Sequence, residues 1–248
     1  MSLGEFELIA RHFRAPTAAR DDVVLGVGDD GAVVRVPPGA GVVTVACSVA
    51  GEPGDDGREH GEALMARALL RLRGRGARPA WALLALTVPS TDRPWLTPAI
   101  EGLRAVAGEQ GVALIGGDTT RGPAMLTVFA HGLASAGTTG PEPDAAWSAA
   151  LIDGGDRPAR LLRALPALES LAVVGADASD GLALALDAVA ERTGCRPPTP
   201  VLGAAPSAGG HGLVLLVAAA HHAALCGRAS DLGLRLTTLG PLQPHGAR

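Results

Sequence analysis

The sequence contains no lysine and no asparagine, and all 21 of its basic residues are arginine. A Walker A loop uses a lysine to reach the β- and γ-phosphates of a nucleotide, and a protein kinase uses a lysine on its third strand. Both nucleotide-binding classes are therefore excluded. A protein of this composition that handles phosphates has to use metal ions held by carboxylates, backbone amides and arginine.

Other features that the sequence lacks exclude further classes of protein. The net charge of -4 and the pI near 6.0 leave no basic surface of the kind that binds nucleic acid. No apolar run reaches the ~18 residues of a membrane span, and residues 1–13 lack the apolar centre of a secretion signal. The three cysteines (Cys47, Cys195 and Cys226) are scattered without CxxC spacing, which indicates reduced thiols. We expect a cytoplasmic protein that binds neither nucleic acid nor membrane.

The chain has 248 residues, 47% hydrophobic and 19% charged, which is enough for a packed core in one large or two modest domains. Apolar β-branched segments alternate with segments of helical periodicity, so we expect an α/β fold. The composition changes after about residue 136, and residues 138–147 (TTGPEPDAAW) are typical of a linker. The predicted domains are 1–138 and 139–248. The expected helices cover 4–13, 59–73, 97–111 and 180–194, and the expected strands lie within 22–36, 41–51, 79–89, 112–118, 124–134, 149–156 and 171–182.

Three acidic segments share one chemical character: each follows an apolar stretch and places glycine next to aspartate. Residues 116–122, GGDTTRG, follow the apolar run 112–115 and are expected to form a turn. Clustered carboxylates repel one another unless a cation neutralises them, and hard oxygen ligands suit Mg²⁺ together with substrate phosphates. The segments predict a magnesium-phosphate site if they meet in the fold. Their polar residues are Asp29 and Asp30; Asp118, Thr119, Thr120 and Arg121; and Asp177, Ser179 and Asp180.

Each of these turns also has a structural interpretation. Asp-Gly is common turn chemistry, and Asp180 could cap the helix that follows it. Asp29 could be a turn residue that holds Asp30 in place, and Arg121 could brace its loop by pairing with a nearby acid. Nothing in the spacing requires the three segments to converge.

Five segments taken in order resemble the thiamine-monophosphate kinase family, within the aminoimidazole ribonucleotide synthetase-like superfamily. They are GEFELIARHF, GVGDDGAVV, PAWALLALTVP, IGGDTTRGP and DASDGLALAL. The resemblance is ordered over residues 4 to about 133 and patchy in the second half. It implies a two-domain α/β fold of mixed sheets flanked by helices, with a shortened second domain, and a homodimer formed through the first-half sheets.

The resemblance also implies chemistry: transfer of the γ-phosphate of ATP to thiamine monophosphate, with several Mg²⁺ ions held by aspartates. The implied metal ligands are Asp29, Asp30, Asp118, Asp177 and Asp180, of which Asp30, Asp118 and Asp180 would be central to catalysis. The implied nucleotide contacts are Gly117, Asp118, Thr119, Arg121 and Ser179.

Several positions depart from the family pattern. Ala46 and Cys47 stand where the family has a Thr-Asp pair, and Arg71 stands where it has a metal-holding acid on the following helix. His211 and Gly212 replace two further acids. Arg71 would repel Mg²⁺, although it could pair directly with phosphate or with Asp30. Two hypotheses follow: a kinase of this type with a changed site or acceptor, and a catalytically degraded relative that binds nucleotide or a partner.

Other candidate residues receive structural interpretations. We expect His221 and His222 to be an exposed pair on a helix and not metal ligands. We expect Cys47 not to act as a nucleophile, because no base is identified for it. The three tryptophans are expected in the core or at an interface: Trp81, Trp95 and Trp147.

Overall fold

The computed structural model describes residues 5–13, 15–28, 31–53, 56–135, 147–196 and 210–244. It divides into two compact units. Unit 1 comprises Met1–Leu72 and Ala77–Ala136, and unit 2 comprises Arg73–Gly76 and Gly137–Arg248. The two units are described separately.

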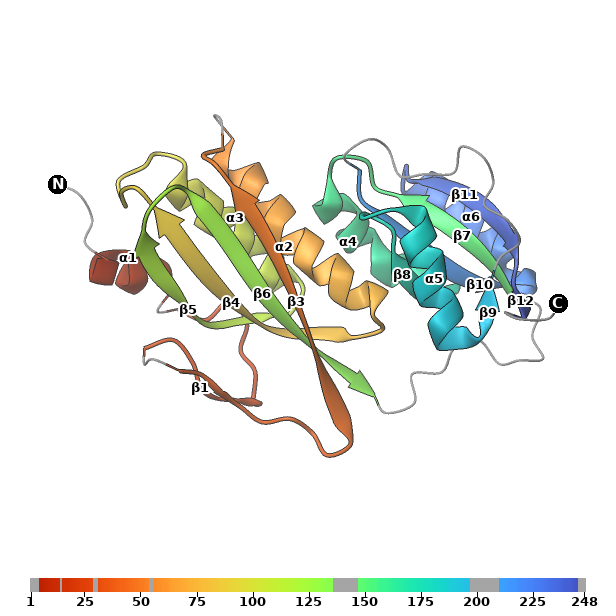
Figure 1. Cartoon of the computed structure of the whole chain (residues 1–248), viewed down its shortest axis with the longest axis horizontal. Coiled ribbons are helices and arrows are strands. Elements are labelled where there is room, and N and C mark those ends of the chain that lie inside the picture. Colours follow the sequence, from red (N-terminus) through yellow and green to blue (C-terminus); the bar gives the residue numbers. More distant parts are fainter. Residues whose placement is uncertain are drawn as a thin grey trace. The chain divides into compact units, whose positions relative to one another are not determined.

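Unit 1 is built on a four-stranded mixed sheet in the order β3-β6-β4-β5 (Figure 1). β4 and β5 are parallel and are joined through the helix α3, whereas β6 pairs antiparallel with both β3 and β4. A short antiparallel pair, β1-β2, precedes the sheet. The elements are α1 (Glu5–His12), β1 (Val23–Leu25), β2 (Val33–Val34), β3 (Ala40–Ala50), α2 (Gly57–Gly74), β4 (Arg78–Val88), α3 (Leu96–Glu109), β5 (Ala113–Arg121) and β6 (Met125–Ser135).

Helices α2 and α3 lie together behind this sheet (Figure 1), and glycines set how closely their backbones approach. A Cβ at Gly61 of α2 would lie 1.8 Å from the Ala99 carbonyl oxygen of α3. A Cβ at Gly102 of α3 would lie 2.2 Å from the Arg58 carbonyl oxygen of α2. The helices can therefore bury their apolar stripes against the sheet only because these two positions carry no side chain.

The other face of the sheet in unit 1 is open. Along β3 the exposed residues alternate with less exposed ones, which is the period of a strand with one face toward the core. Val42, Met125 and Phe129 are large apolar residues that remain exposed on β3 and β6. An open face of this kind is unusual unless something covers it.

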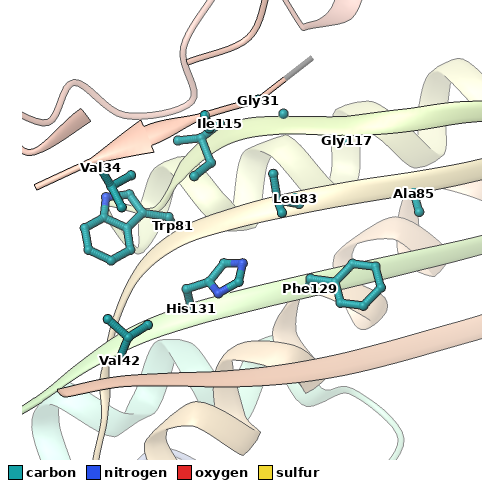
Figure 2. Close-up of a pocket in the computed structure, with 12 residues that line it drawn as sticks. Gly31, Val34, Val42, Trp81, Leu83, Ala85, Ile115, Gly117, Phe129 and His131 are labelled. Atoms are coloured by element: carbon teal, nitrogen blue, oxygen red, sulfur yellow. The ribbon is translucent and has the colours of Figure 1, made fainter. Parts of the chain in front are cut away.

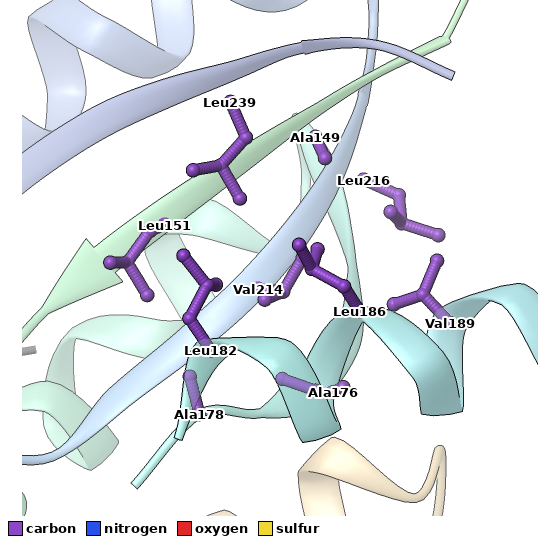
Figure 3. Close-up of a cluster of buried hydrophobic side chains, with 11 residues drawn as sticks. Ala149, Leu151, Ala176, Ala178, Leu182, Leu186, Val189, Val214, Leu216 and Leu239 are labelled. Carbon is purple, nitrogen blue, oxygen red and sulfur yellow. The ribbon is translucent and has the colours of Figure 1, made fainter. Parts of the chain in front are cut away.

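Unit 2 is an antiparallel sheet in the order β11-β7-β10-β8. Helix α5 packs on one of its faces through an apolar cluster in which Leu182, Leu186 and Val189 meet Leu151 and Val214 (Figure 3). The elements are β7 (Trp147–Asp153), α4 (Pro158–Leu168), β8 (Ala172–Asp177), α5 (Leu182–Thr193), β9 (Cys195–Arg196), β10 (Gly212–Ala218), the 3-10 turn η1 (Ala219–His221), α6 (His222–Asp231), β11 (Arg235–Pro241) and β12 (Gln243–Pro244).

The opposite face of this sheet is covered as well. Helix α6 contacts β10 and β11, and α4 contacts α6. Leu213 and Leu215 of β10 are fully buried although they alternate with Val214 and Leu216, which face α5. A strand buried on both faces is a continuous apolar run, as β10 is.

The expected mixed α/β fold of sheets flanked by helices is confirmed, with two corrections. The segment GGDTTR was expected to be a turn, but it continues β5 to Arg121. Helix α4 was not predicted, since Pro158 and Pro166 obscured it. Pro158 occupies the first turn, where proline is tolerated, and the apolar residues Leu161, Leu162, Leu165 and Leu168 keep helical spacing.

Candidate functional site

The open face of unit 1 holds a pocket of about 460 Å³ (Figure 2). Side chains of three strands form its floor: Trp81 and Leu83 from β4, Phe129 and His131 from β6, and Ile115 from β5. One wall comes from the segment that includes β2. The remaining lining residues are Gly31, Ala32, Val34, Val42, Ala85, Gly116 and Gly117.

The two glycines of the motif bring backbone to the edge of this pocket. Gly117 has a φ of 155°, and a Cβ there would lie 1.9 Å from the Leu84 carbonyl oxygen. Gly116 meets only the end of a flexible side chain, Leu83 Cδ2, at 3.2 Å. Any side chain at position 117 would therefore overlap the backbone of β4. Because neither residue has a side chain, their peptide groups are accessible from the pocket.

The motif residues after the glycines lie on the outer part of β5. Asp118 is exposed and is paired in register with Ala85, so its side chain shares the face on which the pocket opens. Thr120 Oγ1 is 2.8 Å from Thr87 Oγ1, and Thr119 is half-buried. Arg121 is exposed, and among the described residues it makes no ion pair that would brace its loop.

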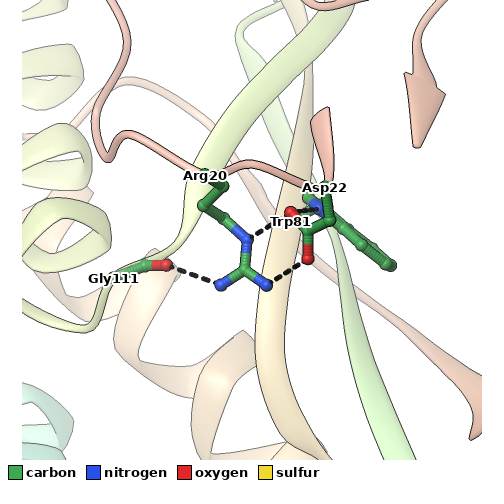
Figure 4. A network of polar contacts seen from close by, with 4 residues as sticks. All are labelled: Arg20, Asp22, Trp81 and Gly111. Atoms are coloured by element: carbon green, nitrogen blue, oxygen red, sulfur yellow. Dashed lines mark hydrogen bonds and ion pairs between the residues drawn. The ribbon is translucent and has the colours of Figure 1, made fainter. Parts of the chain in front are cut away.

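A polar network fixes the segment that enters the β1-β2 pair (Figure 4). Arg20 donates to both carboxylate oxygens of Asp22, from Nε at 2.9 Å and from Nη2 at 2.5 Å. Arg20 Nη1 donates to the Gly111 carbonyl oxygen at 3.1 Å, and its guanidinium lies 5.7 Å from the centroid of the Trp81 ring. Trp81 Nε1 completes the network by donating to Asp22 Oδ1 at 3.1 Å.

This network holds the pocket wall against the sheet. Val23 and Val34 pack against the buried cluster around Trp81, and Arg35 N donates to the Asp22 carbonyl oxygen at 2.7 Å. Hydrogen bonding from Arg20 lowers the pKa of Asp22, with Trp81 adding to the effect, because both donors favour the ionised carboxylate. The described residues on both sides of this network, Val23 and Val34, are therefore held against the sheet.

Two more contacts fasten the preceding residues to the edge of unit 1. Thr17 Oγ1 donates to the Val112 carbonyl oxygen at 2.7 Å and accepts from Leu114 N at 2.8 Å. Arg104 Nη2 of α3 donates to the Ala15 carbonyl oxygen at 2.8 Å. Residues 15–22 thus form a strap along the start of β5. The contacts that fasten this strap to the sheet and to α3 join residues 59 to 97 positions apart, so no local pattern predicts it.

His131 is the titratable side chain on the pocket floor. Its Nδ1 is 2.9 Å from Thr44 Oγ1 of β3. Burial lowers the pKa of His131, because removing the imidazolium from water disfavours the charged form. His131 could not be singled out from the sequence, because it stands in an apolar strand without a neighbouring acid.

The positions that depart from the family pattern are well defined in unit 1. Ala46 is exposed on β3 and pairs in register with Phe129, whereas Cys47 is buried toward the helices. Arg71 of α2 is half-buried, and its Nη1 lies 3.5 Å from the Ala46 carbonyl oxygen. The Arg71 guanidinium therefore lies beside the segment of β3 in which Ala46 and Cys47 replace the Thr-Asp pair of the family pattern.

In unit 2 the second-half acidic segment lies at the carboxyl end of β8. Asp177 Oδ1 accepts from Ser179 N at 3.1 Å and from Ser179 Oγ at 2.7 Å. His211 Nδ1 lies 3.2 Å from Ser179 Oγ. Aspartate, serine and histidine therefore form a hydrogen-bonded row at the entrance to α5.

Asp180 does not cap α5, contrary to one interpretation of the sequence. The residue before the helix is Gly181, with a φ of 128°, and no side chain makes the capping hydrogen bond. Asp180 is exposed.

The magnesium prediction rests partly on Asp29 and Asp30, which lie outside the described residues. Within the part of the chain that the structure describes, no three side chains of histidine, cysteine, aspartate or glutamate are grouped to hold a metal ion. Taken separately, unit 1 carries the exposed carboxylate of Asp118, and unit 2 carries Asp177 and Asp180. Carboxylate oxygens are the ligands that Mg²⁺ prefers.

The expected surroundings of other residues are partly corrected. Trp81 and Trp95 are buried, and Trp147 is half-buried against the core of unit 2. His221 is exposed as expected, but His222 is half-buried and bonded, with its Nε2 2.9 Å from Thr238 Oγ1. No helix among the described residues is long and apolar enough to cross a membrane.

Comparison with known proteins shows the family of this chain. Residues 28–134 match the model of the AIR synthase related protein, N-terminal domain. The chain is 34% identical over 230 residues to thiamine-monophosphate kinase of Salmonella typhimurium, a match that covers 79% of this chain and 71% of that protein. The chain belongs to the thiamine-monophosphate kinase family. A thiamine-monophosphate kinase of Escherichia coli is 39% identical over 141 residues, which are 55% of this chain and 43% of that enzyme.

Solved structures agree with this assignment. Thiamine-monophosphate kinase from Stenotrophomonas maltophilia K279a matches with a TM-score of 0.64 and 29% identity, over 98% of this chain and 95% of that one. The hydrogenase maturation protein HypE in complex with ATP matches with a TM-score of 0.63 over 97% of this chain and 87% of that one. At 15% identity, the likeness to HypE shows a shared fold only.

Proposed function

We propose that this protein transfers the γ-phosphate of ATP to thiamine monophosphate, with Mg²⁺ as cofactor. The observation that carries the proposal is the 34% identity to the Salmonella enzyme, over 71% of that enzyme. The HypE complex named with ATP supports a nucleotide site on this fold. Phosphoryl transfer depends mainly on positioning and charge neutralisation, so a site without lysine can perform it if metal ions take the phosphate charge.

The proposed roles follow the chemistry of each residue. Asp29, Asp30, Asp118, Asp177 and Asp180 would hold Mg²⁺, which would neutralise the phosphate oxygens. The nucleotide would contact the exposed backbone at Gly117 and the side chains Thr119, Arg121 and Ser179. Arg121 suits an anion, because it is exposed at the end of β5 and presents a planar set of donors. Residues 1–138 would supply the dimer and nucleotide side, and residues 139–248 the second domain.

We further propose that a second copy of the chain covers the open face of unit 1. Phe129 is 37% exposed, Val42 47% and Met125 44%, and they share the face with the pocket. Burying apolar area at about 25 cal/mol per Å² favours association of such a surface. A homodimer with this face at its centre would enclose the pocket beside Asp118.

The alternative is a relative that binds nucleotide without catalysing transfer. Three replacements favour it: Ala46 with Cys47 and, separately, Arg71 in unit 1, and His211 with Gly212 in unit 2. Each removes a carboxylate from the site implied by the family, and Arg71 adds a positive charge. A weaker field for Mg²⁺ would slow the chemistry more than it would weaken ATP binding, since the guanidinium could itself contact phosphate.

The deciding experiment incubates the purified chain with ATP, Mg²⁺ and thiamine monophosphate and measures thiamine diphosphate by chromatography. Turnover at ordinary kinase rates, about 1–100 per second, supports the kinase and rejects the alternative. Without turnover, calorimetry with a non-hydrolysable ATP analogue separates a nucleotide binder from a protein that binds none.

A matched pair of variants tests whether Asp118 takes part in nucleotide binding. Asp118→Asn is expected to weaken binding of the magnesium-bound ATP analogue by about 10- to 100-fold, because it removes one charged contact. Glu101→Gln makes the same chemical change on α3, outside the pocket, and is expected to leave binding unchanged. Equal affinities for the two variants would remove Asp118 from the site.

A further inference from the structure

A second cluster of reactive groups lies in unit 2, where α6 meets β11. Cys226 follows His222 by one helical turn, and its Sγ lies 3.8 Å from His222 Nδ1. The other ring nitrogen, His222 Nε2, lies 2.9 Å from Thr238 Oγ1 of β11. Thiol, imidazole and hydroxyl thus form one row that the proposed kinase chemistry does not use.

The local structure explains both the contact and its accessibility. Residues four apart on a helix lie on the same face, so α6 places Cys226 above His222. Leu225 and Ala229 form the buried side of α6, while Cys226 and His222 are half-buried at its border. The packing of α6 against β11 brings the exposed Thr238 to the imidazole. The thiol is therefore held in place and still open to a small reagent.

The order of the three groups places a proton acceptor beside the thiol. Thr238 Oγ1 can accept from Nε2–H, which leaves the lone pair of Nδ1 directed toward the sulfur. Once Nδ1 has taken the thiol proton, both ring nitrogens are donors and both contacts persist. A nucleophile, a base and a group that orients the base is the arrangement that activates side-chain nucleophiles.

We propose that Cys226 is a modification site, a thiol that low-molecular-weight disulfides convert to a mixed disulfide with His222 as the base. The thiol proton moves to His222 Nδ1, and the Cys226 thiolate attacks one sulfur of the disulfide. The bond between the reagent's two sulfurs breaks as the new S–S bond forms, and the leaving thiolate takes up a proton. Cys226 is oxidised, and the released half of the reagent is reduced.

The other two cysteines provide internal controls. Cys47 is 6% exposed on the helix side of the unit 1 sheet, so reagent reaches it only on opening of that unit. Cys195 is half-buried like Cys226, but the described residues place no imidazole against its sulfur. Because Cys226 and Cys195 are similarly exposed, a difference between their reaction rates measures the effect of His222.

The test uses the full chain, reduced and freed of reductant, with 5,5′-dithiobis(2-nitrobenzoic acid) or oxidised glutathione at pH 7. Labelling is followed in time and assigned by peptide mass spectrometry, with Cys226→Ser as the assignment control. An ordinary thiol is about 3% ionised at pH 7, which limits the gain from complete deprotonation to about 30-fold. We expect Cys226 to react about tenfold faster than Cys195, with Cys47 unreactive.

Variants of the two partners decide the proposal. His222→Gln is expected to slow Cys226 about tenfold and leave Cys195 unchanged. Thr238 is a positioning residue, so Thr238→Val should slow Cys226 by a smaller factor and Thr238→Ser should restore it. Melting curves identify any variant that unfolds. If Cys195 reacts as fast as Cys226, or if a folded His222→Gln variant reacts at the parent rate, the proposal is overturned. Neither outcome bears on the kinase assignment.

Discussion

The two units bury their sheets to different extents. In unit 2, α5 covers one face and α4 with α6 the other, and β10 is a continuous apolar run. In unit 1, α2 and α3 cover one face only, and β3 alternates between exposed and less exposed residues. The comparison shows that unit 1 carries a surface which its described residues leave uncovered, and Asp118 and Thr120 of GGDTTRG are in register with residues of that face.

The units also differ in the hydrogen-bond partners of their acidic side chains. Unit 1 fixes its pocket wall by the Arg20, Asp22 and Trp81 network, whereas unit 2 aligns Asp177, Ser179 and His211 at the start of a helix without a side-chain cap. The first arrangement stabilises the fold through satisfied donors and acceptors. The second is a hydrogen-bonded row that contains Asp177 and Ser179, for which the family resemblance implies contacts with metal and nucleotide.

The largest expected effect tests the open face directly. Phe129→Glu should weaken the proposed dimer about a thousandfold, since about 2 kcal/mol is lost at each of two equivalent patches. Sedimentation velocity measures the change. Leu184→Glu is the matched control, because Leu184 is 64% exposed on α5 of unit 2 and should leave association unchanged. If the parent protein is monomeric at high concentration, the proposal that a second copy covers the open face of unit 1 is wrong.

A second prediction concerns the two adjacent glycines of β5. Gly117→Ala should destabilise the protein by about 3 kcal/mol, because its Cβ would overlap the β4 backbone and its φ disfavours a side chain. Gly116→Ala meets only the flexible end of Leu83 and should cost less than about 1 kcal/mol. Urea unfolding measures both. Equal losses would mean that β4 and β5 are not as close as they are in this structure.

The third prediction addresses the network that holds the pocket wall. Asp22→Asn should cost about 2 kcal/mol at pH 7, because it removes the charge that Arg20 and Trp81 contact. Trp81→Phe should cost about 1 kcal/mol through the lost N–H while keeping the ring over Arg20. Urea unfolding measures both losses. The Asp22 side chain is 22% exposed, so solvent screens the pair only in part.

The pH dependence of this effect has a definite sign. The folded pKa of Asp22 lies below its ordinary value, so its stabilisation is present above the unfolded pKa and is lost as pH falls through the folded pKa. The parent and Asp22→Asn stabilities should therefore converge below about pH 4. A constant difference from pH 7 down to pH 3 would show that the carboxylate charge is not what the network uses.

Much of the fold was predictable because its signals are local. The β-branched run of β3, the helical spacing in α2 and the apolar run of β4 each follow from neighbouring residues. GGDTTR was assigned to a turn because glycine and aspartate favour turns, but pairing with β4 along 81–88 outweighs that local preference. Helix α4 was missed for a similar reason, since its interior proline is a local signal that packing of its leucines overrides.

The site was predictable where one motif carries it and not where distant segments combine. Asp118 and Gly117 could be singled out from seven consecutive residues. Trp81 and Asp22 are 59 residues apart, and His131 and Thr44 are 87 apart, so no spacing rule connects them. These contacts depend on strand order in the sheet, which the sequence alone did not specify.

The smallest expected effect concerns acid sensitivity in unit 1. Burial lowers the pKa of His12, His60 and His131, all of which lie in unit 1. The unfolded chain binds protons at these residues more readily than the folded one, so stability should fall as pH decreases from 7 toward 5. His131→Gln should reduce that slope without abolishing it, because two buried histidines remain. Chemical unfolding at half-unit pH steps measures the slope. An unchanged slope in the variant would mean that His131 keeps access to water on the open face, and the burial of the pocket floor would then have to be reconsidered.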